Sequence, residues 1–275
     1  MNMMHISKIV KHLVIINFII FFGTSFFGNK YLFDHIFALY YPLSGFFAYW
    51  QVLTHMFMHG DLFHLLVNMF ALWMFGSSVE RVFGQRKFLF FYISCGFGAV
   101  ALTFLVYNIQ IYPLLNALEA EGFSFNLIRE ISKINIIDGN FFNPDILYKR
   151  MLEVLEAYGK SYDYVSNNSF KLLFDLNVKS NGSMVGASGA IMGILVAFGM
   201  LNPNAELMLI LLPIPIKAKY FVPGIILIDL FSAFSGVAIF GPSNTAYVAH
   251  IGGAITGFLI MYFWKKNQFD KFRWN

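Results

Sequence analysis

The stretch FLFFYISCGFGAVALTFLVY, residues 88–107, contains no Lys, Arg, Asp or Glu. A second stretch, TAYVAHIGGAITGFLIMYFW at residues 245–264, is uncharged over the same length. A helix of about 20 apolar residues spans the roughly 30 Å hydrocarbon layer of a bilayer. Hydrophobic residues make up 58% of the chain and charged residues only 12%, against about 25% charged in an ordinary soluble domain. The sequence therefore predicts an integral membrane protein.

Four further apolar segments extend this pattern to a polytopic helical bundle. The six predicted transmembrane helices cover residues 9–27, 62–79, 88–107, 185–202, 220–240 and 245–264. The predicted fold class is all-α, with a transmembrane domain formed by residues 1–107 and 181–275. Residues 31–59 are rich in aromatic side chains but contain Pro42 and Gly45, which suits a loop at the membrane interface.

Residues 108–180, between the third and fourth predicted spans, are expected to form a helical insertion outside the membrane. Asn143 followed by Pro144 is typical of a helix N-cap and the first helical position. Apolar residues recur from there at near-helical spacing up to Gly159, which predicts one amphipathic helix.

Basic residues predict the topology. Six spans put both termini on the same side of the membrane. The basic residues at the ends of the spans on that side are Lys8, Lys11, Arg81, Arg86, Lys87, Lys217, Lys219, Lys265, Lys266, Lys271 and Arg273. The opposite short loops carry Lys30 alone, so the positive-inside rule places both termini in the cytoplasm and the insertion outside. The net charge of +4 thus marks topology and does not indicate a nucleic-acid partner. The composition is compatible with a bacterial inner membrane.

The sequence GASG at residues 186–189 opens the fourth predicted span. A serine in the first helical turn has a backbone N–H without an intrahelical acceptor, so Ser188 could supply both a nucleophile and an oxyanion donor. The alternative is helix packing, because Gly189 and Gly193 have the small-residue spacing that lets membrane helices approach closely.

His250 lies inside the sixth predicted span, on the same helical face as Gly253 and Gly257. An ionisable side chain in a span is costly and marks a functional site by default. We expect Ser188 to be its partner, because glycine-containing faces would bring the fourth and sixth helices together. The alternative is a histidine that is bonded to a backbone carbonyl.

The run HMFMHGDLFHLLVN, residues 55–68, is a third polar cluster. Asp61 is a predicted N-cap for the second span, which places His64 and Asn68 on one face as hydrogen-bond donors for an oxyanion. Polar contacts between helices and a metal site at His55 and His59 are the alternatives. The run has no His-Glu-x-x-His pattern and no clear further ligand beyond His64, so we expect no metal ion.

In their order and spacing, these three motifs resemble the rhomboid family of intramembrane serine proteases. The resemblance covers about residues 9–107 and 185–264, and Glu80 with Gly84 resembles the Glu-x-x-x-Gly element of the family. It implies Ser188 as the nucleophile, His250 as the base, no cofactor, and an oxyanion site formed by His64, Asn68 and the Ser188 amide.

The resemblance also implies a Ser-His dyad without a third carboxylate, and no acidic residue lies near His250 in the sequence. Asp229, inside the fifth span, is expected to make a structural hydrogen bond or to belong to a site open to the cytoplasm. Many bacterial members have Arg after the loop tryptophan, whereas Gln51 follows Trp50 here. This departure leaves open how the loop is held.

The function expected from the resemblance is hydrolysis of peptide bonds in or near the spans of other membrane proteins. The alternatives are a catalytically silent rhomboid-like protein that binds transmembrane helices, and a small transporter. A transporter would need charged groups at the midplane of several spans, where only His250 and Asp229 qualify. The expected partners are transmembrane substrates and the lipid bilayer, and the residues specify no oligomeric state.

Overall fold

The computed structural model describes residues 5–26, 30–139, 141–209, 212–239 and 246–271. The chain divides into two compact units. The first contains Met1–Lys30, His55–Thr103 and Val185–Asn275, and the second contains Tyr31–Thr54 and Phe104–Met184. The second unit therefore contains residues 31–54 of the predicted interfacial loop together with the predicted insertion.

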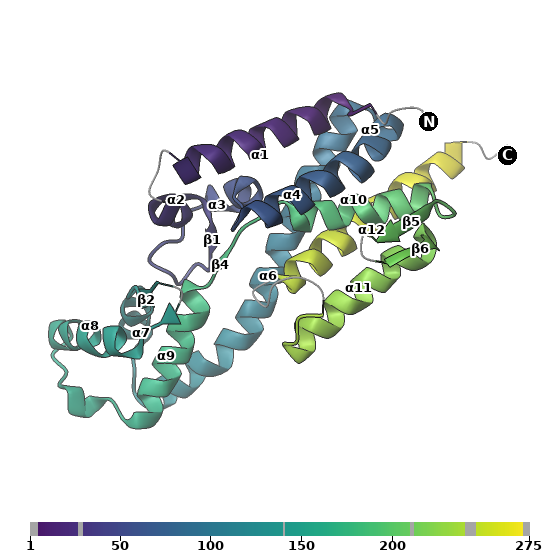
Figure 1. Ribbon diagram of the computed structural model, residues 1–275. Helices are drawn as coiled ribbons and strands as arrows, with labels where there is room; N and C mark the ends of the chain where they lie inside the picture. Colours follow the sequence, from purple (N-terminus) through teal and green to yellow (C-terminus); the bar gives the residue numbers. More distant parts are fainter. Residues whose placement is uncertain (1–4, 27–29, 140, 210–211, 240–245, 272–275) are drawn as a thin grey trace. The chain divides into compact units, whose positions relative to one another are not determined.

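The first unit is a bundle of apolar helices (Figure 1). Its helical elements are α1 (Lys8–Phe26), η1 (His55–Phe57), α4 (Leu62–Ala71), η2 (Leu72–Gly76), α5 (Ser77–Phe83), α6 (Gln85–Ala120, up to residue 103), α10 (Ser188–Leu201), α11 (Ala218–Ser235) and α12 (Tyr247–Lys271). Between α10 and α11, β5 (Glu206–Leu209) pairs antiparallel with β6 (Leu212–Lys217).

Among the described residues, five helices are long and apolar enough to cross a membrane: α1, the continuous segment Leu62–Phe83, α6, α11 and α12. Together with α10, they occupy the six predicted positions, so the predicted all-α polytopic fold is confirmed. Residues 240–245 of the predicted fifth and sixth spans lie outside the described residues.

The fourth predicted span is shorter than expected. The helix α10 has 14 residues, or about 21 Å at 1.5 Å per residue, which is less than the roughly 30 Å of a hydrocarbon core. It begins at Ser188 because Gly186 has a φ of 119°, a conformation that a helix cannot include. The fifth span similarly ends at Ser235, where Gly236 adopts the left-handed conformation.

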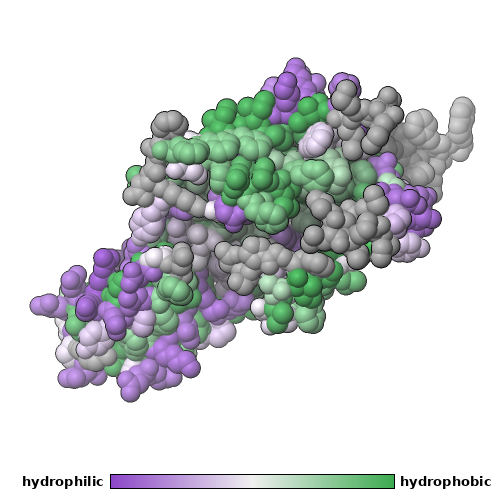
Figure 2. Space-filling model, viewed as in Figure 1, coloured by the Kyte–Doolittle hydropathy of each residue, from purple (hydrophilic) through white to green (hydrophobic). Residues whose placement is uncertain are grey.

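The core of the first unit lies around α10, which packs against α12, α11 and the Leu62–Phe83 segment. Nearly all of its residues between Gly189 and Gly199 are buried. The outward faces of other helices expose large apolar side chains, including Ile19 and Phe63, at 65% and 71%. Figure 2 shows this apolar surface over α1. Such faces suit contact with lipid, as expected for a membrane protein.

Glu80 joins the start of α1 to α5. Its carboxylate accepts hydrogen bonds from the N–H groups of Ile9 and Val10, at 2.9 and 3.0 Å, and from the Ser7 hydroxyl. These N–H groups lie in the first turn of α1 and have no intrahelical acceptor. The acidic residue of the predicted Glu-x-x-x-Gly element therefore caps a neighbouring helix.

The second unit has its own apolar core, which includes Ile111, Leu118, Leu127, Ile131 and Leu147. Its elements are α2 (Lys30–Phe37), β1 (Leu39–Tyr40), α3 (Gln51–Thr54), residues 104–120 of α6, α7 (Phe125–Ser132), β2 (Ile137–Asp138), β3 (Phe141–Phe142), α8 (Pro144–Ala157), η3 (Tyr162–Tyr164), α9 (Asn167–Asn181) and β4 (Ser183–Met184). The strand β1 pairs antiparallel with β4, and β2 with β3. Many residues around α8 are hydrophilic at the surface (Figure 2).

Two predictions within this unit have different outcomes. The cap of α8 is confirmed, because the Asn143 side chain accepts from the N–H of Asp145 at 2.9 Å and Pro144 is the first helical residue. The third predicted span ends at residue 107, whereas its helix, α6, continues to Ala120. Ile111 and Leu118 are buried in the core of the second unit, and this packing carries the helix past its apolar run.

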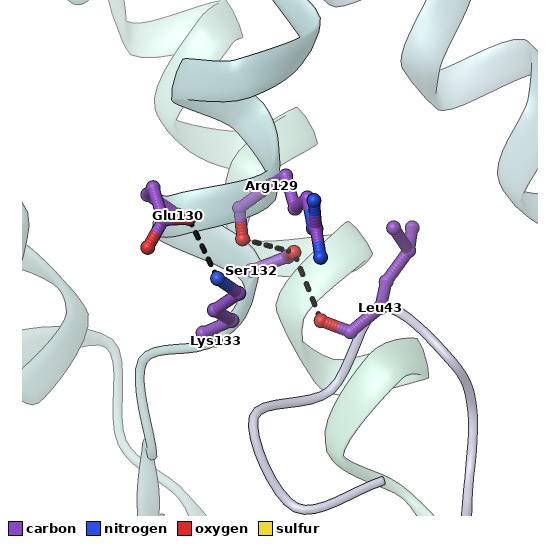
Figure 3. Close-up of polar contacts among 5 residues, drawn as sticks. All are labelled: Leu43, Arg129, Glu130, Ser132 and Lys133. Atoms are coloured by element: carbon purple, nitrogen blue, oxygen red, sulfur yellow. Dashed lines mark hydrogen bonds and ion pairs between the residues drawn. The ribbon is translucent and has the colours of Figure 1, made fainter.

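Polar contacts hold the loop 42–50 within the second unit. Figure 3 shows the end of α7, where the Ser132 hydroxyl lies 3.2 Å from the carbonyl of Leu43 and 2.9 Å from that of Arg129. Lys133 forms an ion pair with Glu130 at 2.6 Å in the same view. These contacts tie the loop to the insertion.

Gln51 also holds this loop. Its side chain is fully buried, and its Nε2 donates to the carbonyls of Phe46 and His35 at 2.7 and 3.0 Å. Its Oε1 accepts from the N–H groups of Ala48 and Tyr40 at 3.1 and 3.3 Å. A neutral amide that both donates and accepts thus satisfies the backbone of a tight loop without burying a charge.

Candidate active site

Ser188 is the first residue of α10, and its side chain is partly exposed. The backbone before it is anchored by the N–H of Gly186, which donates to the carbonyl of His55 at 2.9 Å. The Ser188 N–H has no acceptor four residues back, because the helix begins here. Ser188 therefore presents both its side-chain hydroxyl and its backbone N–H at the start of the helix.

His250 lies in the first turn of α12, one residue beyond the buried Ala249. Its Nε2 is 2.8 Å from the Ser188 hydroxyl oxygen, which is a good hydrogen-bond distance. The structure thus brings together the two residues that the sequence paired, although they are 62 positions apart.

Glycines make this distance possible. A Cβ on Gly253 would lie 2.6 Å from the carbonyl carbon of Gly189, and a Cβ on Gly257 would lie 2.7 Å from the Cα of Gly193. Ordinary contacts of a Cβ are 3.4 Å or longer. Only glycine therefore allows α10 and α12 to pack this closely, and the helix-packing interpretation of Gly189 and Gly193 holds alongside the hydrogen bond of Ser188.

The predicted N-cap of the second span is confirmed, since the Asp61 carboxylate accepts from the N–H of His64 at 2.8 Å. The imidazole of His64 lies beside the backbone that leads into α10. A Cβ on Gly186 would be 2.8 Å from its Nε2, and the oxygen of Ser188 is 3.8 Å from the same Cβ position. His64 and Ser188 thus border the same glycine.

Asn68 is buried one turn after His64, at 5% exposure. Its Nδ2 donates to the carbonyl of His64 at 3.0 Å. One of its two amide N–H groups is therefore used within α4, and the second is left for another acceptor.

Asp229 is the residue that sequence reasoning did not place here. It lies on α11 with 7% exposure, and its Oδ2 is 3.0 Å from the Nδ1 of His250. The sequence places no acidic residue near His250, whereas the fold brings Asp229 next to it, and the hydrogen bond expected of Asp229 is made to this imidazole. The loop between α11 and α12 separates the two residues by 21 positions, and only the packing of the helices brings them together. The available signal was an acidic residue within an apolar helix.

His59 lies at the edge of this cluster, with 3% exposure and its ring 5.1 Å from that of His64. Burial, reinforced by the neighbouring His64, lowers the pKa of His59 from 6.5 to about 4. It is therefore neutral at pH 7. In the described part of the chain, no group of three or more His, Cys, Asp and Glu residues is arranged to hold a metal ion.

Parts of this chain are similar in sequence to known proteins. A family model described as the Rhomboid domain matches residues 47–113 and 162–267, more than half of the chain. Rhomboid protease GluP of Bacillus subtilis (strain 168) is 39% identical over 54 residues, which cover 19% of this chain and 11% of that protein.

Two mitochondrial proteins give similar matches. The presenilin-associated rhomboid-like protein of Bos taurus is 41% identical over 56 residues, covering 20% of this chain and 14% of that protein. RHOMBOID-like protein 6 of Arabidopsis thaliana is 36% identical over 56 residues, covering 20% and 18%. The chain thus spans less than a fifth of the length of each of these three relatives. The family model matches more than half of the chain, including the segments that contain His64, Ser188 and His250. The chain therefore belongs to the rhomboid family.

Proposed function

We propose that this protein is an intramembrane serine protease that hydrolyses peptide bonds within or near the transmembrane segments of other proteins. The observation that carries the proposal is the 2.8 Å hydrogen bond between the Ser188 hydroxyl and the Nε2 of His250. A serine hydroxyl is a weak nucleophile until a base takes its proton, and a neutral imidazole at this distance can do so.

In the proposed reaction, the Ser188 oxygen attacks the scissile carbonyl while its proton moves to His250. The imidazolium then gives that proton to the leaving amine, which releases the first product and leaves an acyl-enzyme. Water, activated by the same imidazole, hydrolyses the ester and regenerates Ser188. No cofactor is needed for any of these steps.

The oxyanion formed by the attack needs hydrogen-bond donors. The Ser188 amide at the start of α10 supplies one, with the helix dipole behind it. His64 borders the same glycine as Ser188, and Asn68 keeps one free N–H a turn later. Each donor that reaches the oxyanion contributes about 10²-fold or more in rate.

The short length of α10 supports a site below the membrane surface. A helix of 14 residues does not reach both faces of a bilayer, so with its C-terminal end placed at the cytoplasmic face by Lys217 and Lys219, its first residue, Ser188, would lie inside the hydrocarbon layer. The substrate segment must unwind locally to expose its carbonyl, because the bonds of an intact helix are internally satisfied. We therefore expect cleavage next to small or helix-breaking residues.

The basic residues at the ends of the spans favour cytoplasmic termini, with substrate entering from the outer side. The curated relatives include one bacterial protein and mitochondrial proteins, so a bacterial inner membrane is proposed from composition alone. The first partners to test are single-span membrane proteins.

The test is reconstitution of the protein in liposomes with a single-span reporter. We expect cleavage by the wild-type protein and none by Ser188→Ala or His250→Ala, with Ser78→Ala on α5 as a matched control. Cleavage that persists in either site variant would reject the proposal. Stable binding of the reporter without cleavage by the wild-type protein would favour the catalytically silent alternative.

A further inference from the structure

We propose that Asp229 is a positioning residue for His250, so that the site works as a Ser-His-Asp triad and not as a dyad. This inference rests on the proposed protease function. It starts from one chain of hydrogen bonds through three helices, in which Oγ of Ser188 lies 2.8 Å from Nε2 of His250, and Nδ1 of His250 lies 3.0 Å from Oδ2 of Asp229.

The chemistry of the three groups determines which atom donates and which accepts in each of these hydrogen bonds. A carboxylate only accepts hydrogen bonds, so the contact with Asp229 requires a proton on Nδ1 of His250. A neutral imidazole carries one proton, and Nε2 then has a free lone pair facing Ser188. The carboxylate thus selects the one tautomer that can act as a base toward the serine.

The contact also fixes the orientation of the imidazole ring. Asp229 and His250 side chains are only 11% and 15% exposed, and they come from neighbouring helices that pack along each other. Held at both nitrogens, the ring has no freedom to turn away from Ser188. When the imidazolium forms during the reaction, the adjacent negative charge stabilises it.

The setting of Asp229 argues against an incidental contact. A carboxylate inside an apolar membrane helix is expensive and persists where it is paired. Among the residues that the structure describes, the other groups near His250 are Ser188 from α10, the ring of Tyr247 on its own helix at 6.4 Å, and the imidazole of His64 on α4, which borders the same glycine as Ser188. Asp229 is the acidic member of this set.

One experiment measures the tautomer directly, without relying on proteolysis. The intact protein is labelled with ¹⁵N-histidine in lipid nanodiscs, and the His250 signals are assigned as those lost in His250→Ala. We expect a protonated Nδ1 and an unprotonated Nε2 in the wild-type protein, and a mixture of both tautomers in Asp229→Asn. The opposite tautomer in the wild type, or no change in the variant, would overturn the proposal.

A kinetic arm tests whether this tautomer matters for the reaction. Asp229→Asn should lower kcat for the reporter by about 10²-fold or more, with KM within about 2-fold, because substrate contacts are kept and the base is lost. Ser232→Ala, which removes a buried hydroxyl one turn along α11, is the matched control and should keep the wild-type rate. An unchanged kcat in Asp229→Asn would overturn the positioning role.

The two arms separate the possible failures. An inactive wild-type protein that still shows the Asp229-dependent tautomer would count against the proposed protease function alone. An active protein whose kcat depends on Ser188 and His250 but not on Asp229 would count against the triad alone. Thermal unfolding of each variant in detergent distinguishes a loss of fold from a loss of base, and a folded Asp229→Asn with low kcat supports the proposal.

Discussion

Replacing Gly253 by Ala should separate the two helices that hold the site. The new Cβ would lie 1.8 Å from the carbonyl oxygen of Gly189 and 2.6 Å from its carbonyl carbon, where an ordinary contact needs at least 3.4 Å. Backbone cannot rotate away as a side chain can, so α10 and α12 must move apart by about 1.6 Å. The 2.8 Å distance between Ser188 and His250 then grows to about 4.4 Å, beyond hydrogen-bond range.

A displacement of this size costs about 10²-fold in rate, since proton transfer needs the donor and acceptor in contact. Overpacking also destabilises the fold by about 1–3 kcal/mol. The assay is reporter cleavage in liposomes, with thermal unfolding measured in parallel on the same preparations.

The matched control is Gly23→Ala on α1, because a Cβ at Gly23 would have no atom within 4 Å. It should retain the wild-type rate. Wild-type cleavage by a folded Gly253→Ala protein would refute the argument that the close approach of the two helices sets the distance between Ser188 and His250.

Three further predictions concern stability. Glu80→Ala removes the cap of α1 and should lower the free energy of unfolding by about 0.5–2 kcal/mol. Gln51→Leu leaves four backbone groups of the loop without partners and should cost at least about 1–3 kcal/mol, measured by thermal unfolding. His59 has a folded pKa of about 4 against 6.5 when unfolded, so its stabilisation is complete above pH 6.5 and is lost as the pH falls toward 4, by about 3 kcal/mol in all.

Each of these has a control. Glu80→Ala should melt earlier while Arg81→Ala, at an exposed position beside it, should not. Gln51→Leu should be compared with substitution of the exposed Tyr49 by Leu. His59→Gln should flatten the fall of stability between pH 6.5 and 4, whereas His5→Gln, at an exposed position, should leave it unchanged. The same acid sensitivity in both histidine variants would show that another group titrates.

The sequence predicted those features of the fold that are encoded locally. Long apolar runs identified the spans, and the caps Asp61 and Asn143 were recognisable because a cap and its helix are adjacent in the chain. The continuation of α6 to Ala120 was missed because it depends on burial of Ile111 and Leu118 in the core of the second unit. Tertiary packing there overrides a local pattern that looks like the end of a span.

The site likewise has residues that a local motif identifies and residues that only tertiary packing brings into place. Ser188 and His250 were found because each stands in a motif of small residues within its own span. Asp229 stands in no motif, and its contact with His250 depends on how α11 packs against α12, which the spacing of residues along the chain does not reveal. The backbone partners of Gln51 were likewise hidden, because they come from both ends of a folded loop.

The most direct test of the account is the identity of the residue that a fluorophosphonate probe modifies in the intact protein. We predict that mass spectrometry finds the phosphonyl group on Ser188, with no labelling in Ser188→Ala and at least about 10²-fold slower labelling in His250→Ala. Labelling at another residue, or labelling of Ser188 at the same rate without His250, would contradict the claim that this imidazole activates this serine.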